Sequence, residues 1–382
     1  MVIGGGMVVR EQILPSLLHL ERLGRVGAVT VCAPRHETVA SLCEAEEIRR
    51  AFPGQSFRVL PGGPGERQPE LWRSALAQLP PRQLVVVALP DQLHYKVVLE
   101  ALRRDQHVCC VKPLVLTARH GSEIAEEARH RKLLAVVEYH KRFDDRNLMA
   151  RRAYREGRFG EFRLGSACLL EKWRYRHSNF QNWMTAEHSD AFTYVGCHYV
   201  DLVHFITGLL PVAVSVYGVL DRFPNGREGY LWTDARVLWE NGACLNVQNA
   251  LGVPAAAPGS NLQGLTLYCQ TGDTGALLAH ADQQRGIRHS YLAPEEYAEP
   301  NPDFFQYVDF GGPGLTPVGY GYRSVEAVVD AVVAVEAGER TVQEIDGAGI
   351  LATAANSGYN DRVIEAARES LRLGGSEVRC AP

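Results

Sequence analysis

Short, mostly apolar segments alternate with amphipathic segments over the first 140 residues of this chain. The apolar segments, which have the length and composition of strands buried on both faces of a sheet, are 26–33, 84–89, 107–111 and 133–137. The helix-like segments between them, whose apolar residues recur every three or four positions, include 37–51, 69–79 and 117–131. Strands that alternate with helices form a doubly wound parallel sheet, so the pattern predicts an α/β protein with a first domain over residues 1–145.

The pattern changes after residue 145. Strand-like runs then occur at 162–170, 212–220, 231–239, 243–250, 262–270 and 275–280. Helices are expected at 145–156, 190–207, 323–337 and 346–372, and an ordered loop at 293–322. Because strands in series pair mostly antiparallel, residues 146–382 are predicted to form an α+β domain with an open, mostly antiparallel sheet. Its closing helices over 346–372 could pack back on the first domain.

The charge balance excludes two classes of partner. The chain has 40 Lys and Arg residues against 44 Asp and Glu residues, a net charge of −4, whereas proteins that bind nucleic acid or membrane surfaces carry a basic excess. No apolar run reaches the roughly 18 residues of a membrane span, and no signal peptide is visible. The nine cysteines form no CxxC pair and most lie in apolar runs, which is typical of reduced thiols. We therefore expect a cytoplasmic protein.

A glycine turn follows the first three residues, which are apolar. The turn occupies the first two positions of the dinucleotide fingerprint G-x-G-x-x-G, and Val9 holds the third. Its place between a strand and a helix favours a pyrophosphate site over a plain turn. The residues expected to form this site are Gly4, Gly6, Met7 and Val8. Since only three residues precede the turn, either the first strand is very short or it starts upstream of Met1.

The end of the second predicted strand bears on the choice of cofactor. A carboxylate usually binds the ribose hydroxyls there, but this chain has Ala33 at that position and Arg35 two residues later. A guanidinium pairs with phosphate through two parallel hydrogen bonds, so Arg35 favours NADP over NAD. The alternative is a solvated arginine at a strand end, with NAD as the cofactor.

Two further segments follow predicted strands at the edge where the carboxyl ends of parallel strands meet a ligand. The cofactor contacts expected there are Leu89, Pro90, Asp91, His94, Lys112 and Pro113. Lys112 follows a buried strand directly and precedes a proline, an unusual place for an ordinary solvated lysine. Beside a nicotinamide ring, its ammonium group could hydrogen-bond the reacting oxygen and favour proton transfer.

Together these segments resemble the glucose–fructose oxidoreductase / inositol dehydrogenase / MocA (Gfo/Idh/MocA) family over nearly the whole chain. The matching motifs are Leu89-Pro90-Asp91-Gln92-Leu93-His94, Val111-Lys112-Pro113, Glu138 to Asp144, and Tyr194 to Leu202 with Gly208 beyond. The resemblance implies a Rossmann domain, a C-terminal domain with an open sheet, redox chemistry at a carbinol carbon of sugars and cyclitols, and dimers or tetramers formed through that sheet. Val111 and Tyr194 stand where the family has Glu and Asp.

The helix expected at 190–207 places Tyr194, His198 and Asp201 at i, i+4 and i+7, on one stripe. The resemblance makes His198 the general acid/base, with Lys112 and Tyr194 as its catalytic partners. The alternative is a half-buried His198 paired with Asp201. Gly196, which lacks a side chain, would let a ligand approach the helix. No metal is expected, because His198 and the histidine six residues later lie about 240° apart around the helix.

The loop 171–183 is dense in aromatic and hydrogen-bonding side chains, which suit a polyhydroxylated ligand. An interface or lid loop is the alternative. The substrate-binding residues predicted over the whole chain are Lys112, Arg142, Lys172, Asn182, Trp183, Tyr194, His198 and Asp201.

These features predict an NAD(P)-dependent oxidoreductase that transfers hydride between nicotinamide and a carbinol carbon of a sugar, sugar derivative or cyclitol, as a homo-oligomer. One alternative is a redox-neutral enzyme that holds its nicotinamide tightly and catalyses glycoside cleavage, elimination or epimerisation. The other, motivated by the missing acidic residues, is a non-catalytic sensor of dinucleotide or sugar.

Overall fold

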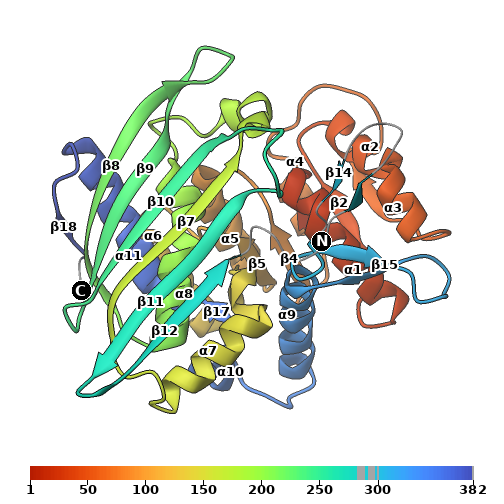
Figure 1. Cartoon of the computed structure of the whole chain (residues 1–382). Coiled ribbons are helices and arrows are strands. Elements are labelled where there is room, and N and C mark those ends of the chain that lie inside the picture. Colours follow the sequence, from red (N-terminus) through yellow and green to blue (C-terminus); the bar gives the residue numbers. More distant parts are fainter. Residues whose placement is uncertain (282–288, 291–296, 299–300, 381–382) are drawn as a thin grey trace. The chain divides into compact units, whose positions relative to one another are not determined.

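The computed structural model describes residues 1–281, 289–290, 297–298 and 301–380 (Figure 1). The chain forms two compact units. The first comprises residues 1–115, 119–144 and 302–356, and the second comprises residues 116–118, 145–301 and 357–382. The segment 302–356 therefore belongs to the first unit, whereas the sequence pattern assigned all residues after 145 to the second domain.

The first unit contains a seven-stranded sheet in the order β17-β6-β5-β4-β1-β2-β3. Its strands are β1 (Val2–Ile3), β2 (Thr30–Cys32), β3 (Arg58–Leu60), β4 (Leu84–Val87), β5 (His107–Val111), β6 (Ala135–Glu138) and β17 (Ala352–Thr353). Strands β1 to β6 are parallel, and β17 pairs antiparallel with β6. The predicted doubly wound sheet is confirmed, with the strand order of dinucleotide-binding folds.

The helices expected over 37–51 and 346–372 are each divided in the structure. The helices that lie wholly or largely in the first unit are α1 (Leu14–Arg22), α2 (His36–Glu44), α3 (Glu46–Ala51), α4 (Leu71–Ala77), α5 (His94–Arg103), α6 (Ala118–Arg131), α9 (Tyr320–Glu336) and α10 (Val342–Ala348). Ala45 has an extended ψ of 113°, which separates α2 from α3. Gly349 ends α10 with a left-handed φ of 61°, and α11 (Ala354–Arg372) starts only after β17. The helical segment expected over 346–372 therefore comprises the end of α10, strand β17 and helix α11.

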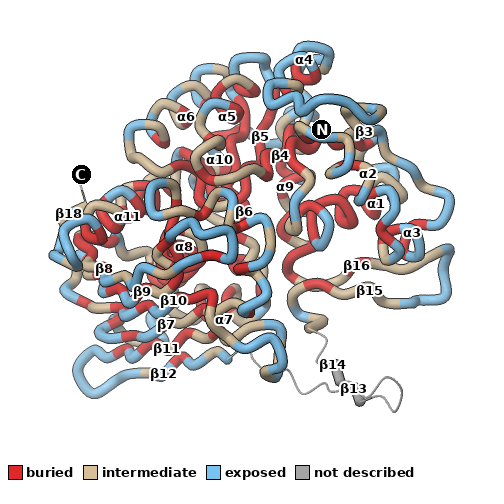
Figure 2. The backbone as a smooth tube through the Cα atoms, turned by 90° about the horizontal axis from the view of Figure 1, so that it is seen from above, coloured by how far each residue is buried: buried red, intermediate tan, exposed pale blue. Residues whose placement is uncertain are grey.

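The core of the first unit lies between the sheet and helices α1 and α9. Leu17 on α1 and Val328 on α9 are at most 5% exposed and belong to one apolar cluster with Val86 and Val136 of the sheet. Figure 2 shows the central strands and the facing side of α9 as buried. Because α9 comes from the segment 302–356, this core needs residues that are far apart in the sequence.

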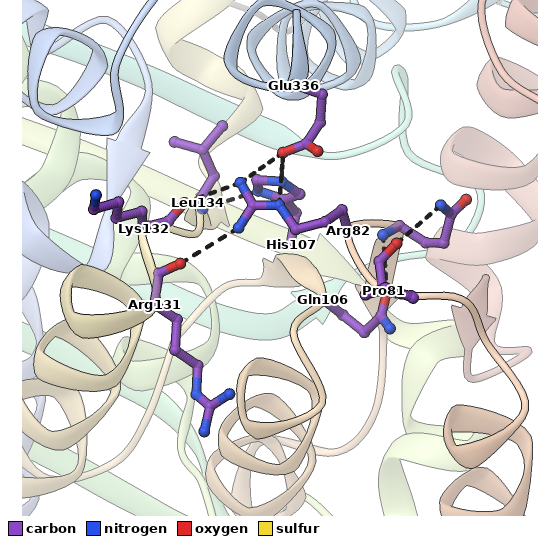
Figure 3. A network of polar contacts seen from close by, with 9 residues as sticks. Pro81, Arg82, Gln106, His107, Arg131, Lys132, Leu134 and Glu336 are labelled. Carbon is purple, nitrogen blue, oxygen red and sulfur yellow. Dashed lines mark hydrogen bonds and ion pairs between the residues drawn. The ribbon is translucent and has the colours of Figure 1, made fainter. Parts of the chain in front are cut away.

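A polar network at the amino end of β5 ties α9 to the sheet (Figure 3). The His107 side chain is fully buried. Its Nε2–H donates to Glu336 on α9 at 2.8 Å, and its Nδ1 accepts the backbone N–H of Leu134 at 3.0 Å. Arg82 pairs with the same Glu336 carboxylate at 2.6 Å. Burial lowers the pKa of His107, so the network holds a neutral ring whose tautomer is fixed by the Leu134 N–H.

The second unit contains a seven-stranded sheet in the order β12-β11-β7-β10-β9-β8-β18. Its strands are β7 (Phe162–Lys172), β8 (Pro211–Arg222), β9 (Glu228–Trp239), β10 (Cys244–Val253), β11 (Leu262–Thr271), β12 (Thr274–Ala281) and β18 (Val378–Arg379). Strands β7 and β10 are parallel, and the other neighbours in this sheet are antiparallel. The predicted open, mostly antiparallel sheet is confirmed.

Helices cover one face of this second sheet. They include α7 (Asp145–Arg155), α8 (Cys197–Thr207) and α11, and both views place α8 and α11 on the same side of the strands (Figures 1 and 2). Along β9, Leu231 and Ala235 are buried, whereas Asp234 and Arg236 are exposed. This alternation is typical of a sheet with one packed face and one open face.

Short strand pairs occur in the segment 289–318. Strand β13 (His289–Ser290) pairs with β14 (Tyr297–Ala298), and β15 (Gln306–Val308) pairs with β16 (Thr316–Val318). The loop expected at 293–322 lies partly outside the described residues, and its described part contains β14, β15, β16 and the start of α9. Among the helices of the described chain, none has the length and apolarity that crossing a membrane requires.

Candidate active site

The glycine turn of the first unit has the geometry of a phosphate cradle. Gly4 has a φ of 125°, and a Cβ atom added to it would lie 2.0 Å from the carbonyl oxygen of Ala88, so only glycine fits. A Cβ on Gly6 would meet no described atom within 4 Å. The helical conformation starts at the next residue, Met7. The turn therefore offers open backbone at a helix N-terminus, which fits the pyrophosphate of a dinucleotide.

Val9, which replaces the third glycine of the fingerprint, is fully buried in the core. A glycine at this position lets a helix pack closely on the sheet. Here the helix forms a π turn over Val9–Ile13 before continuing as α1. The wider turn thus occurs where the small residue is missing, and π turns are frequent at functional sites.

A cavity of about 120 Å³ opens beside the carboxyl ends of β1, β2 and β4. Its lining includes Ile3, Cys32, Ala33, Pro34, Leu89, Leu93 and Trp72. Arg35 is exposed and occupies the N-cap position of α2, directly after the lining residue Pro34. The position of this cavity is the one at which doubly wound sheets bind ligands, outside the carboxyl ends of the strands.

His94 has a positioning role in the structure, and its predicted contact with the cofactor stays a prediction. The side chain is fully buried, and its ring nitrogens lie 2.8 Å from the carbonyl oxygens of Pro113 and Leu89. The ring therefore holds together the loops that follow β4 and β5. Asp91 starts the short helix in the first of these loops and is also buried.

Lys112 lies at the carboxyl end of β5, directly after the last strand residue. Its side chain is half-buried, and the peptide bond to Pro113 is cis. The glycine turn after β1, the Pro90 segment after β4 and Lys112 after β5 thus lie at the same edge of one parallel sheet. The structure brings these predicted cofactor residues together.

A buried carboxylate lies at this edge, at a residue that the sequence analysis named as part of a motif but gave no role. Glu138, the last residue of β6, is 4% exposed and accepts hydrogen bonds from Gln12 at 2.8 Å, Ser324 at 2.6 Å and His140 at 3.1 Å. In the sheet register, Glu138 lies directly opposite Val111. A carboxylate is therefore present one strand away from the position at which the resembled family has its Glu. The signal in the sequence was a single acidic residue that ends an apolar strand.

Arg142 lies in the short helix His140–Phe143 that follows β6, and its side chain is buried. Its Nη1 lies 3.5 and 3.4 Å from the carbonyl oxygens of Gly349 and Ile350. The guanidinium thus lies against the end of α10 within the first unit, and its predicted contact with substrate stays a prediction.

In the second unit, a buried carboxylate caps the helix that carries His198. Asp190 accepts the backbone N–H of Thr193 at 2.8 Å and its hydroxyl at 2.6 Å. Burial raises the pKa of Asp190, although these hydrogen bonds act in the opposite direction. The helix starts with a π turn over Phe192–Gly196, continues as α8, and ends at its C-cap Gly208, which has a left-handed φ of 82°.

His198 and Asp201 are both buried on α8, at 3% and 1% exposure. The hydroxyl of Tyr359 on α11 donates to the Asp201 carboxylate at 2.9 Å. Asp201 thus links α8 to α11, which is a structural role beside the predicted contact with substrate.

Gly196 does not provide the ligand approach that we expected. A Cβ atom added to it would lie 2.5 Å from the Oδ1 atom of Asn249 on β10 and 2.6 Å from the ring of Phe192. The glycine therefore faces the sheet, and its lack of a side chain lets the helix pack directly on β10.

The aromatic residues of loop 171–183 cluster around Tyr194. The Tyr194 ring makes edge contacts with Phe180 and Trp183, with centroid distances of 4.9 and 5.6 Å. The structure thus brings together two predicted substrate residues, Trp183 and the half-buried Tyr194. Asn182 is exposed, and its Nδ2 donates to Asn179 at 2.9 Å.

Lys172 anchors a loop. It is 4% exposed, and its ammonium group donates to the carbonyl oxygens of Pro254, at 3.3 Å, and Ala257. These bonds hold the segment after β10 against the end of β7. Since the ammonium is engaged by backbone, the structure does not favour the substrate contact predicted for Lys172.

A doubly wound sheet with a glycine cradle, joined to a second unit with an open sheet, defines a dinucleotide-binding oxidoreductase of the two-domain class. Residues 1–139 match the family model of an oxidoreductase family with an NAD-binding Rossmann fold, and residues 147–273 match the Gfo/Idh/MocA C-terminal domain. The chain belongs to the Gfo/Idh/MocA family.

Curated relatives match over part of their length. An uncharacterized oxidoreductase of Schizosaccharomyces pombe, C26H5.09c, is 38% identical over 79 residues, which cover 21% of each chain. Levoglucosan dehydrogenase of Pseudarthrobacter phenanthrenivorans is 21% identical over 140 residues, or 36% of each chain. The NADP-dependent scyllo-inositol 2-dehydrogenase IolW of Bacillus subtilis is 26% identical over 138 residues, or 36% of this chain and 37% of its own. The chain thus spans between a fifth and two fifths of these relatives.

A solved structure matches over the whole chain. GenD2 from gentamicin A biosynthesis, in complex with NAD, aligns with a TM-score of 0.71 and 17% identity over 100% of this chain and 95% of its own. At this identity, the likeness shows the fold.

Proposed function

We propose that the protein is a dehydrogenase that prefers NADP(H) and transfers hydride between nicotinamide and a carbinol carbon of a sugar, sugar derivative or cyclitol. The observation that carries the proposal is the joint presence of the Gly4–Gly6 cradle and Lys112 at one edge of the parallel sheet. The curated names of two relatives, levoglucosan dehydrogenase and scyllo-inositol 2-dehydrogenase, support the substrate class.

The first unit would hold the dinucleotide. Gly4, Gly6 and the helix N-terminus at Met7 would bind the pyrophosphate, and Arg35 would face a 2′-phosphate. The nicotinamide group, when bound, supplies the hydride acceptor or donor. Lys112 would lie beside it and hold the reacting oxygen by a hydrogen bond.

His198 would accept and donate the proton. In the oxidation, the carbinol oxygen gives its proton to an imidazole nitrogen of His198, while the hydrogen on carbon leaves as hydride. The Lys112 ammonium would stabilise the negative charge that develops on this oxygen, and Tyr194 would orient the hydroxyl. In the reduction, His198 returns the proton.

Steady-state reduction of NADP with a panel of sugars and cyclitols tests these roles. We expect Lys112→Ala and His198→Ala each to lower kcat by about 10²- to 10⁴-fold, the usual contribution of a positioned acid or base. His130→Ala is the control, because His130 is exposed on α6 and belongs to no predicted site. Full turnover in both variants would contradict the assignment.

The outer face of the second sheet supports a homo-oligomer, which we propose to be a dimer or tetramer. Leu164, Tyr217, Tyr268 and Leu277 are each at least half exposed on its strands. Apolar side chains gathered on one face mark interaction surfaces. Light scattering after gel filtration would report the mass. We also propose a cytoplasmic location, because all nine cysteines are free thiols.

A non-catalytic sensor is the second candidate, and the replacements Val111 and Tyr194 favour it. It predicts that purified protein binds NADP but turns over no member of the panel. A redox-neutral enzyme would instead retain bound nicotinamide through purification and convert substrate without net change in the absorbance of the cofactor.

A further inference from the structure

The Pro- and Gly-rich segment 61–70, which follows β3, lies against the end of β2. The backbone N–H of Gln68 donates to the carbonyl oxygen of Pro34 at 2.7 Å, and the His36 ring lies 3.1 Å from the carbonyl oxygen of Pro61. Arg67 precedes Gln68, and Arg35 follows Pro34. The Pro34–Gln68 hydrogen bond therefore brings the backbones of the two arginines close together.

Arg67 also lines the cavity of about 120 Å³ at the carboxyl ends of β1, β2 and β4. The lining also includes the uncharged residues Ala33, Pro34 and Trp72 and the charged residues Glu70 and Lys96. Ala33 stands where a carboxylate would bind ribose hydroxyls and repel a phosphate. The end of β2 thus lacks the acidic group that selects NAD, and the carboxylate that the lining does contain, Glu70, lies after Arg67 in the segment 61–70.

The other cations near the cavity are already compensated. The Glu70 carboxylate binds both Lys96 at 2.7 Å and Arg73 at 2.6 Å. Hydrogen bonds from these two side chains lower the pKa of Glu70, so it stays ionised. By contrast, Arg67 and Arg35 are exposed, and neither forms an ion pair with a carboxylate among the described residues. Two neighbouring positive charges that lack a counterion favour a dianion.

We infer that Arg67 acts with Arg35 as a pair of guanidinium groups that bind a phosphomonoester on the adenosine ribose, which makes Arg67 a residue that selects NADP over NAD. The inference rests on the proposed function, since it concerns the cofactor of that reaction. Phosphate oxygens accept paired hydrogen bonds from guanidinium, and a lysine cannot reproduce this fork.

Calorimetric titration with adenosine 2′,5′-bisphosphate and with 5′-AMP tests the inference, because these ligands differ only in the 2′-phosphate. Arg67→Ala should weaken binding of the bisphosphate by about 10-fold or more, the size of a lost charge-assisted hydrogen bond, and leave 5′-AMP unaffected. Arg67→Lys should recover only part of the loss. Arg58→Ala is the matched control: Arg58 is an exposed arginine at the opposite end of β3, and its loss changes the net charge equally.

Failure of the Arg67 inference and failure of the proposed function would give different results. Equal affinity of the unmodified protein for the two ligands, or an Arg67→Ala effect no larger than that of Arg58→Ala, would overturn the inference and leave dinucleotide binding standing. If the unmodified protein bound neither ligand, the proposed function would fail together with the inference. The affinity of each variant for 5′-AMP reports whether its cavity is still formed.

Discussion

The network around His107 makes Glu336 a residue on which the stability of the first unit should depend. We predict that Glu336→Ala lowers the free energy of unfolding by about 2–3 kcal/mol. Most of this loss comes from His107, whose ring is fully buried and would keep an N–H without an acceptor, at a cost of about 1–3 kcal/mol. The ion pair with Arg82 adds at most about 1 kcal/mol, because both side chains are about a third exposed.

Urea denaturation, followed by far-ultraviolet circular dichroism, would measure the loss. Glu336→Gln keeps an oxygen that can accept from His107, so its loss should be about half as large. Glu339→Ala provides the control, because Glu339 is an exposed carboxylate just beyond the same helix. If Glu336→Ala were within about 0.5 kcal/mol of Glu339→Ala, the usual range for surface changes, the network would not stabilise the fold.

Three further predictions concern pH and the glycines. Burial lowers the pKa of His107 below the value of about 6.5 expected in the unfolded chain, so the unfolded chain binds the extra proton more readily. The unfolding free energy should therefore fall as the pH drops below about 6.5, and His107→Gln should reduce this slope in denaturation curves taken from pH 7.5 to 5. Gly4→Ala should lower the melting temperature of the first unit, because its Cβ would collide with the Ala88 carbonyl oxygen. Gly6→Ala should leave the melting temperature unchanged, because its Cβ would meet no described atom within 4 Å. It should instead weaken the binding of 5′-ADP, measured by calorimetry, at least about 10-fold. Gly196→Ala should displace the helix from Asn249 and lower kcat more than it changes the affinity for NADP; an unchanged kcat would contradict the packing argument.

The alternating elements of the first unit were predictable because each depends on its own residues. The run 84–89 is apolar on both faces, which is typical of a covered parallel strand. The glycine turn was also predictable, since it depends on local backbone geometry. By contrast, β3 has only three residues between Gly- and Pro-containing segments and no pattern of its own.

The side chains of the site were harder to predict, because their partners come from distant segments. The partners of His94 and Lys172 are backbone carbonyl groups, which leave no trace in the residue pattern. Glu138 acquires its importance from Gln12 and Ser324, which are 126 and 186 residues away along the chain. The direction in which Gly196 faces follows from its contact with β10, which no helical periodicity determines.

The division of the first unit between residues 1–144 and 302–356 has a consequence for its synthesis. Helix α9, whose valines cover one face of the parallel sheet, leaves the ribosome about 200 residues after the last parallel strand. At common elongation rates of about 5–20 residues per second, the apolar surface that α9 covers stays exposed for on the order of 10–40 s before α9 is synthesised. The nascent chain is therefore most prone to aggregation and most dependent on chaperones during this interval. A fragment that stops at residue 144 would lack α9 and keep the apolar surface that α9 covers exposed.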